Sequence, residues 1–175
     1  MAHTVVNLDR MSGTEDSSQL LSVRFYDGND DYADLDNGAI VKLGDLESRT
    51  VNGTTVYERE IRKATTPAGT ESLSELALVA NPELIYDESV RHPLGDYYNK
   101  AGEAIRAYRF HQNDGFSMTA DGFSGSPARG KVVVLGASTK PTVKDSAGSG
   151  DVVIGKIDDV FTLQGYTYYY VVVNL

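Results

Sequence analysis

The chain has 175 residues, of which 41% are hydrophobic and 23% are charged, and it contains no cysteine. This length and balance fit one domain with its own core and argue against wholesale disorder. The 16 basic and 25 acidic residues give a net charge of −9, which repels a phosphate backbone and argues against a nucleic-acid partner. A chain without cysteine forms no disulfide and has no thiolate chemistry.

The N-terminal segment has its own composition. Residues 1–19 combine a short apolar patch, made by Val5, Val6 and Leu8, with a polar run over residues 12–18. Because so little apolar material cannot hold itself in a core, we predict an extended N-terminal arm over residues 1–19. The remainder, residues 20–175, is predicted to form a single β-rich domain.

Neither a membrane span nor a secretory leader is apparent. Residues 1–4 lack the apolar stretch of a signal peptide, and the longest apolar run, residues 166–173, is too short to span a bilayer. We therefore expect synthesis in the cytoplasm and no membrane partner.

From residue 20 onward, short β-type segments alternate with turn residues. The strongest hairpin signal is Asn52-Gly53, which lies between β-forming residues, and Gln164-Gly165 predicts a final hairpin. Ser72 to Glu75 fits a capping box ahead of residues 76–80, where helix and strand remain equal alternatives. Further strands are predicted at residues 21–25, 39–43, 105–110, 116–119, 131–135, 152–157, 161–163 and 166–174.

The pattern of about ten short strands separated by turns is typical of a sandwich or barrel. We therefore predict an all-β fold, an antiparallel sandwich or barrel with at most one or two short helices.

Candidate catalytic residues are few. The segment around Ser124 superficially matches the nucleophile motif of trypsin-like proteases, with His92 or His111 as a base, but Phe123 stands where that motif needs aspartate. A glycine-rich turn between strands explains the same residues. We predict no catalytic residues and no enzyme activity.

Metal and cofactor motifs also fail on spacing. The aspartates of residues 27–36 offer oxygen ligands suited to calcium, but Tyr32 stands where the helix-loop-helix calcium site needs glycine. A solvated loop is the preferred interpretation, with a divalent-ion site as the alternative. The three histidines, at positions 3, 92 and 111, are scattered, and no glycine-rich phosphate loop occurs, so no metal or cofactor is predicted.

Tyrosine is the most unusual feature of the composition, with 11 tyrosines among 16 aromatic residues. Alternation along the last strand predicts that Tyr166, Tyr168 and Tyr170 share one face. Such a face either packs the sheet or contacts a partner, because tyrosine has an apolar ring and a hydroxyl that tolerates water.

Several short sequence segments occur together with this acidic, cysteine-free composition. They are residues 5–11, 37–44, 62–67, 101–109 and 116–119. In these segments the chain resembles the small structural proteins encoded near the major capsid gene of tailed bacteriophages, notably head decoration or auxiliary capsid proteins. The resemblance implies a β-rich protein fixed to the outer capsid lattice of the virion, made in the host cytoplasm, with no catalytic residues.

The predicted function is therefore that of a non-enzymatic virion structural protein that binds the major capsid protein and decorates or stabilises the shell. Self-association on the capsid lattice is a further option. The predicted interface residues are Val5, Val6, Leu8, Tyr166, Tyr168 and Tyr170. The alternatives are a phage tail or neck component, and a module in which tyrosines stack on a glycan.

Overall fold

The computed structural model describes residues 3–83 and 93–174, and within them the fold is all-β, as predicted. Eleven strands and a few single-turn 3-10 helices form in these residues. The strands are β1 (Val6–Arg10), β2 (Leu20–Tyr26), β3 (Ile40–Val51), β4 (Thr54–Thr65), β5 (Leu76–Val79), β6 (Ile105–Arg109), β7 (Gly115–Thr119), β8 (Val132–Val134), β9 (Thr142–Lys144), β10 (Val153–Leu163) and β11 (Tyr166–Val173). The 3-10 turns are η1 (Ser12–Thr14), η2 (Ser17–Gln19), η3 (Leu73–Glu75), η4 (Leu94–Asp96) and η5 (Ala120–Gly122).

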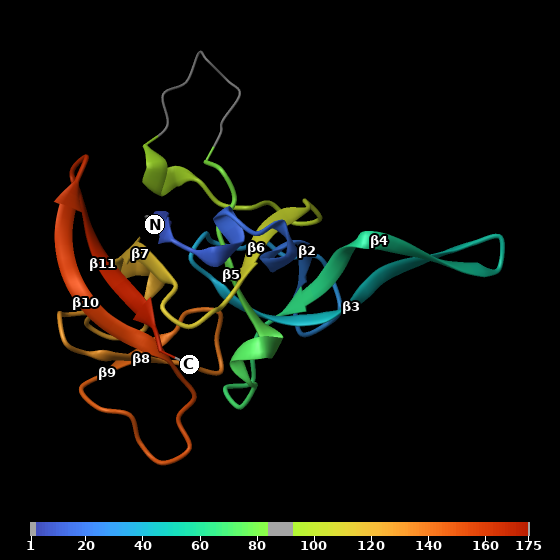
Figure 1. The fold of residues 1–175 in the computed structure, drawn as a ribbon. Coiled ribbons are helices and arrows are strands. Elements are labelled where there is room, and N and C mark those ends of the chain that lie inside the picture. The colour runs from blue at the N-terminus through green and yellow to red at the C-terminus, as the bar shows by residue number, and fades with distance from the viewer. Residues whose placement is uncertain (1–2, 84–92, 175) are drawn as a thin grey trace.

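The described strands form two units (Figure 1). One is an open sheet with the strand order β1-β7-β11-β10-β8-β9, and the other is a closed barrel with the order β2-β4-β3-β5-β6. Neighbouring strands run antiparallel except for β2 and β4, which are parallel. The architecture is therefore a sheet packed on a small barrel.

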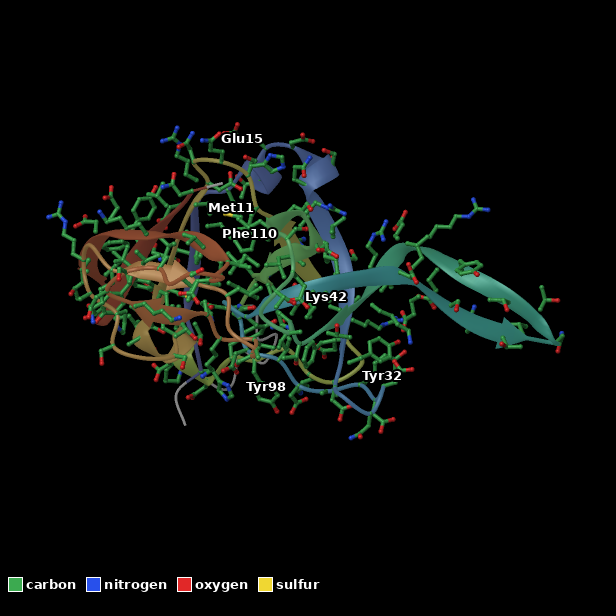
Figure 2. The ribbon with its side chains drawn as sticks, turned by 90° about the horizontal axis from the view of Figure 1, so that it is seen from below. Met11, Glu15, Tyr32, Lys42, Tyr98 and Phe110 are labelled. Carbon is green, nitrogen blue, oxygen red and sulfur yellow. The ribbon has the colours of Figure 1, made fainter. Side chains whose placement is uncertain are left out.

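Two hydrophobic clusters explain how the units hold together. The interior of the barrel contains Val23, Val41 and Ala77, whereas Leu76 and Leu78 on the same strand, β5, point into the layer between barrel and sheet. Successive strand residues face opposite sides, so all four residues of β5 are buried. Figure 2 shows Met11 and Phe110 in that shared layer.

Burial on both faces also explains why residues 76–79 form a strand, where the sequence left helix and strand as equal alternatives. The predicted capping box forms between Ser72 and Glu75, but it caps only the 3-10 turn η3, and the chain continues directly as the strand β5. A continuous apolar run of this length fits a strand with both faces buried.

In the N-terminal segment only β1 is a strand, residues 12–19 contain the turns η1 and η2, and the segment packs on the body. Strand β1 pairs antiparallel with β7, and Val6 lies opposite Met118. Val5 and Met11 are each only 1% exposed. The boundary predicted between residues 19 and 20 therefore does not coincide with a break in packing, because the core that receives Val5 and Met11 is made by strands far along the chain.

Candidate interaction surfaces

The most prominent surface is a two-stranded ribbon formed by the outer halves of β3 and β4, which we define as residues 48–57. It projects away from the barrel into solvent, and every one of its residues is exposed (Figure 1). Its turn is Asn52-Gly53, where both residues have positive φ, 50° and 77°, as a tight I′-type turn requires. The hairpin predicted from the sequence is thus confirmed, but its reach beyond the barrel was not predicted.

The ribbon presents apolar side chains to solvent. Val51, Val56 and Tyr57 are 43%, 42% and 59% exposed. In the ladder Arg49 lies opposite Val56, and Ser48 lies opposite Tyr57. Alternation therefore places Val51 and Val56 on one face with Arg49, and Tyr57 on the other.

Both outer edges of the ribbon are unpaired within the described residues. Strand β5 pairs with β3 only over residues 40–42, and β2 pairs with β4 only over residues 61–65. Unpaired strand edges offer rows of backbone N–H and C=O groups that can add another strand. The ribbon therefore combines exposed apolar side chains with two edges open to pairing.

A buried carboxylate fixes the root of the ribbon. Glu47 on β3 is 5% exposed and accepts hydrogen bonds from Arg24 and Tyr26 on β2, and from the Tyr32 hydroxyl at 2.7 Å. Burial raises the pKa of the Glu47 carboxyl, but these three donors outweigh it and hold the pKa below its ordinary value. The charged carboxylate thus joins the ribbon to the barrel and to the loop that carries Tyr32.

The predicted tyrosine face is present on the side of β11 opposite the residues Val171 and Val173, which belong to the core between sheet and barrel. Tyr166, Tyr168 and Tyr170 occupy alternate positions of β11, opposite Leu163, Phe161 and Asp159 of β10. Tyr168 is only 2% exposed and stacks on Phe161 with ring centroids 5.5 Å apart. The Tyr166 hydroxyl accepts a hydrogen bond from the Gly95 backbone N–H at 3.3 Å. Tyr168 therefore packs the sheet, while Tyr166 and Tyr170 remain half-buried.

Of the three predicted N-terminal contact residues, one is fully buried and two are partly buried. Val5 is buried in the chain's own core, and Val6 and Leu8 are partly buried against the cluster between sheet and barrel. Val5 is thus inaccessible to a partner while β1 stays paired with β7. Interface roles for Val6 and Leu8 stay predictions.

The other candidate residues are engaged locally. Ser124 is exposed, and its backbone N–H and C=O pair with Pro141 and Val143, which makes it part of a strand-like turn. His111 is exposed, and His92 lies outside the described residues. Among the described residues, no hydrogen bond joins the Ser124 side chain to a histidine.

The acidic loop of residues 27–36 uses its carboxylates internally. Asp27 accepts the backbone N–H groups of Asn29 and Asp31 at 2.8 and 3.1 Å, and Asp30 pairs with Lys63 at 2.9 Å. Backbone hydrogen bonds from Asn29 and Asp31 lower the pKa of the Asp27 carboxyl. Within the part of the chain that the structure describes, no group of three or more His, Asp or Glu side chains is placed to hold a metal ion.

A cleft of about 590 Å³ lies where the barrel meets the open sheet. His3 Nδ1 lies 2.6 Å from Asp36 Oδ1, and the His3 ring stacks on Tyr98 with centroids 4.9 Å apart. Lys140 Nζ lies 3.9 Å from the other oxygen of Asp36 and donates to the Asp121 carbonyl at 2.7 Å. The polar groups here pair with one another, which fits a structural junction between the two units.

Comparison with known proteins finds no match: no protein family, no curated protein and no solved structure corresponds to this chain. Among the described residues there is also no helix of the length and apolar character that crossing a membrane requires. The geometry of the chain itself therefore carries the functional argument.

Sequence reasoning missed the ribbon as a surface. A signal was present: residues 48–60 are strand-compatible around a tight turn, yet they lack the apolar alternation of a strand with one buried face. A long hairpin with charged and polar residues on both faces has no core to cover, so such a pattern indicates a ribbon in solvent.

Proposed function

We propose that this protein is a non-enzymatic structural protein of a tailed-bacteriophage virion, which binds the outer surface of the capsid and stabilises the shell. The observation that carries the proposal is the β3–β4 ribbon, which projects from the body with exposed Val51, Val56 and Tyr57. The acidic composition and the sequence segments that resemble head decoration proteins support a role in a virion.

The ribbon supports an assembly role on energetic grounds. A two-stranded ribbon is marginally stable in water by itself, and exposed valines gain nothing there. Contact with another protein would remove apolar surface from water at about 25 cal/mol per Å² and pair the open edges. The hydrogen bonds of Glu47 tie the base of the ribbon to the barrel, which lowers the conformational freedom that contact with a neighbour would remove.

A shell offers many copies of that neighbour. A protein that binds only the assembled shell stabilises it by mass action, and many weak contacts on a lattice add through multivalency. The net charge of −9 suits the exterior of a capsid, away from the packaged DNA.

The test is co-sedimentation with capsids of the phage that encodes the chain, prepared without this protein. The critical variant replaces residues 50–55 with Asn-Gly, which closes the ladder at the hydrogen-bonded Arg49–Val56 pair, also carries Val56→Thr, and keeps Glu47. The intact chain is expected to pellet with capsids and to raise the temperature at which they open. The shortened chain should fold normally but pellet weakly and leave that temperature unchanged.

A second variant keeps the ribbon's length and replaces only its two exposed valines, with Val51→Thr and Val56→Thr. This variant is expected to behave like the shortened chain. Absence of capsid binding by the intact chain, or binding to isolated tails instead, would overturn the proposal. Saturable binding to a glycan array that tyrosine substitutions abolish would favour the glycan-binding alternative.

A further inference from the structure

The open sheet has an unpaired edge of its own at the outer half of β10. Strand β8 pairs with β10 only over residues 153–156, and backbone bonds from Gly130 and Lys131 extend this contact to Ile157. Beyond Ile157, residues 158–163 have β11 on one side and no described strand on the other. Val160 and Leu163 in this segment are 37% and 49% exposed.

This edge and the ribbon lie at opposite ends of the molecule (Figure 1). Each combines an unpaired strand edge with exposed large apolar side chains. A head-to-tail contact between copies needs two different surfaces on each chain. These two surfaces face away from each other, so one copy can contact a neighbour on either side.

We propose that the ribbon of one copy adds its β3 edge, residues 48–51, to the β10 edge, residues 158–163, of a second copy. Backbone hydrogen bonds along the joined edges supply the contact, and burial of Val51 and Val160 adds to it. The second copy is therefore the occupant of the β3 edge, which leaves the outer edge of β4 for the capsid contact of the proposed function.

Charge complementarity selects this pairing. Arg49 is the one charged residue of the ribbon, whereas the β10 edge carries Asp158 and Asp159. All three are exposed, and none forms an ion pair within the described residues. Opposite charges thus meet when β3 of one copy joins β10 of the next.

The same charges oppose the symmetric alternatives. Pairing of two β10 edges would bring four aspartates together, and pairing of two β3 edges would bring Arg49 against Arg49. Charges on an exposed edge block unwanted pairing in this way, and here they leave the head-to-tail contact as the favoured one.

Net charge favours contact through the ribbon when two copies of the chain meet. Residues 45–63 carry four acidic and four basic side chains, whereas the whole chain carries −9. The ribbon and its root therefore carry no net charge, so the repulsion between two negatively charged copies acts on them only weakly. A head-to-tail contact of this kind builds rings or open rows of copies. The inference deepens the proposed function, on which it rests for the placement of such rows on a shell.

The first test measures self-association of the purified chain alone by sedimentation velocity, up to about 1 mM because strand-addition contacts of this size are weak. We expect oligomers that grow with concentration. Arg49→Glu, or Asp158→Arg with Asp159→Arg, should weaken the association by about tenfold or more, and mixing the two variants should restore it. A chain that stays monomeric throughout, or charge variants that associate as well as the original, would overturn the inference.

Disulfide trapping tests the geometry on a chain that has no native cysteine. Thr50→Cys and Val160→Cys are each expected to stay monomeric on oxidation, and a mixture of the two should give a cross-linked dimer. Cross-linking of either variant to itself would show symmetric pairing instead. Because neither experiment uses capsids, a chain that forms rows without binding capsids would refute the proposed function and leave this inference standing.

Discussion

Tyr32 donates a 2.7 Å hydrogen bond to the carboxylate of Glu47. This contact joins the acidic loop after β2 to the root of the ribbon, where Glu47 also pairs with Arg24. A 49% exposed tyrosine thus shields a 5% exposed glutamate. A buried polar cluster therefore ties the base of the ribbon to the barrel.

Substitution of Glu47 with alanine should destabilise the fold by about 3 kcal/mol. The change leaves the Arg24 guanidinium and the Tyr26 hydroxyl without their shared acceptor, and breaking a buried charged pair from one side has a cost of this size. Urea unfolding measures the loss. The control is Glu60→Ala on the exposed part of β4, which should change stability by less than about 0.5 kcal/mol; equal effects of the two substitutions would contradict the role of Glu47.

Stability should fall at acid pH through Glu47 and Glu71. In Glu71, burial raises the pKa, but backbone N–H groups of Ala68, Gly69 and Thr70 outweigh it and hold the pKa below its ordinary 4.5. Both folded-state pKa values are thus depressed. The stabilisation is complete above pH 4.5, the value for the unfolded chain, and is lost as the pH falls through the folded-state pKa values.

The measurement is the urea midpoint as a function of pH between about 3 and 7. The chain carrying Glu47→Gln and Glu71→Gln is less stable at neutral pH, but its midpoint should decline less steeply below pH 4.5. Parallel curves for the two proteins would show that these carboxylates do not contribute to the pH dependence.

Substitution of Met11 with alanine should destabilise the chain by about 2–5 kcal/mol, because Met11 is buried in the layer between sheet and barrel. Deletion of residues 1–12 also removes β1 from β7 and should lower stability further. Near-ultraviolet circular dichroism and chemical unfolding test both changes, with Glu15→Ala as an exposed control. A deletion variant as stable as the full chain would show that this segment is an independent arm.

Gly53→Val should loosen the ribbon and leave the barrel intact. Gly53 has φ of 77°, and a side chain in that region costs roughly 1–2 kcal/mol. Because residues 48–57 contribute no core contact, the expected effect is faster amide hydrogen exchange at Arg49 and Val56, which form a hydrogen-bonded pair of the ladder, with an unchanged global unfolding midpoint. A large shift of that midpoint would mean that the ribbon is part of the cooperative fold.

The local features of the fold could be predicted because turn chemistry is local. Asn52-Gly53 and Gln164-Gly165 both form the predicted hairpins, and alternation correctly places Tyr166, Tyr168 and Tyr170 on one face. The helix-or-strand question at residues 76–80 could not be decided in this way, because a strand buried on both faces shows no alternation.

The features that sequence reasoning missed depend on distant partners. Val5 and Met11 are buried only because β7, more than 100 residues later, pairs with β1. Likewise, nothing near Glu47 in the sequence indicates that Arg24, Tyr26 and Tyr32 converge on it. The ribbon was missed for the opposite reason, since it has no partner within the described chain.

We propose the ribbon as the surface through which this protein joins an assembly. The decisive measurement is hydrogen exchange at residues 48–57, compared between the free protein and the protein bound to capsids. We predict that the outward-facing amides of the ribbon edge, such as those of Ser48 and Thr50, exchange quickly in the free protein and become protected on the particle, together with the outward-facing amides of residues 158–163. Protection confined to other strands, with the ribbon still exchanging freely on the particle, would contradict it.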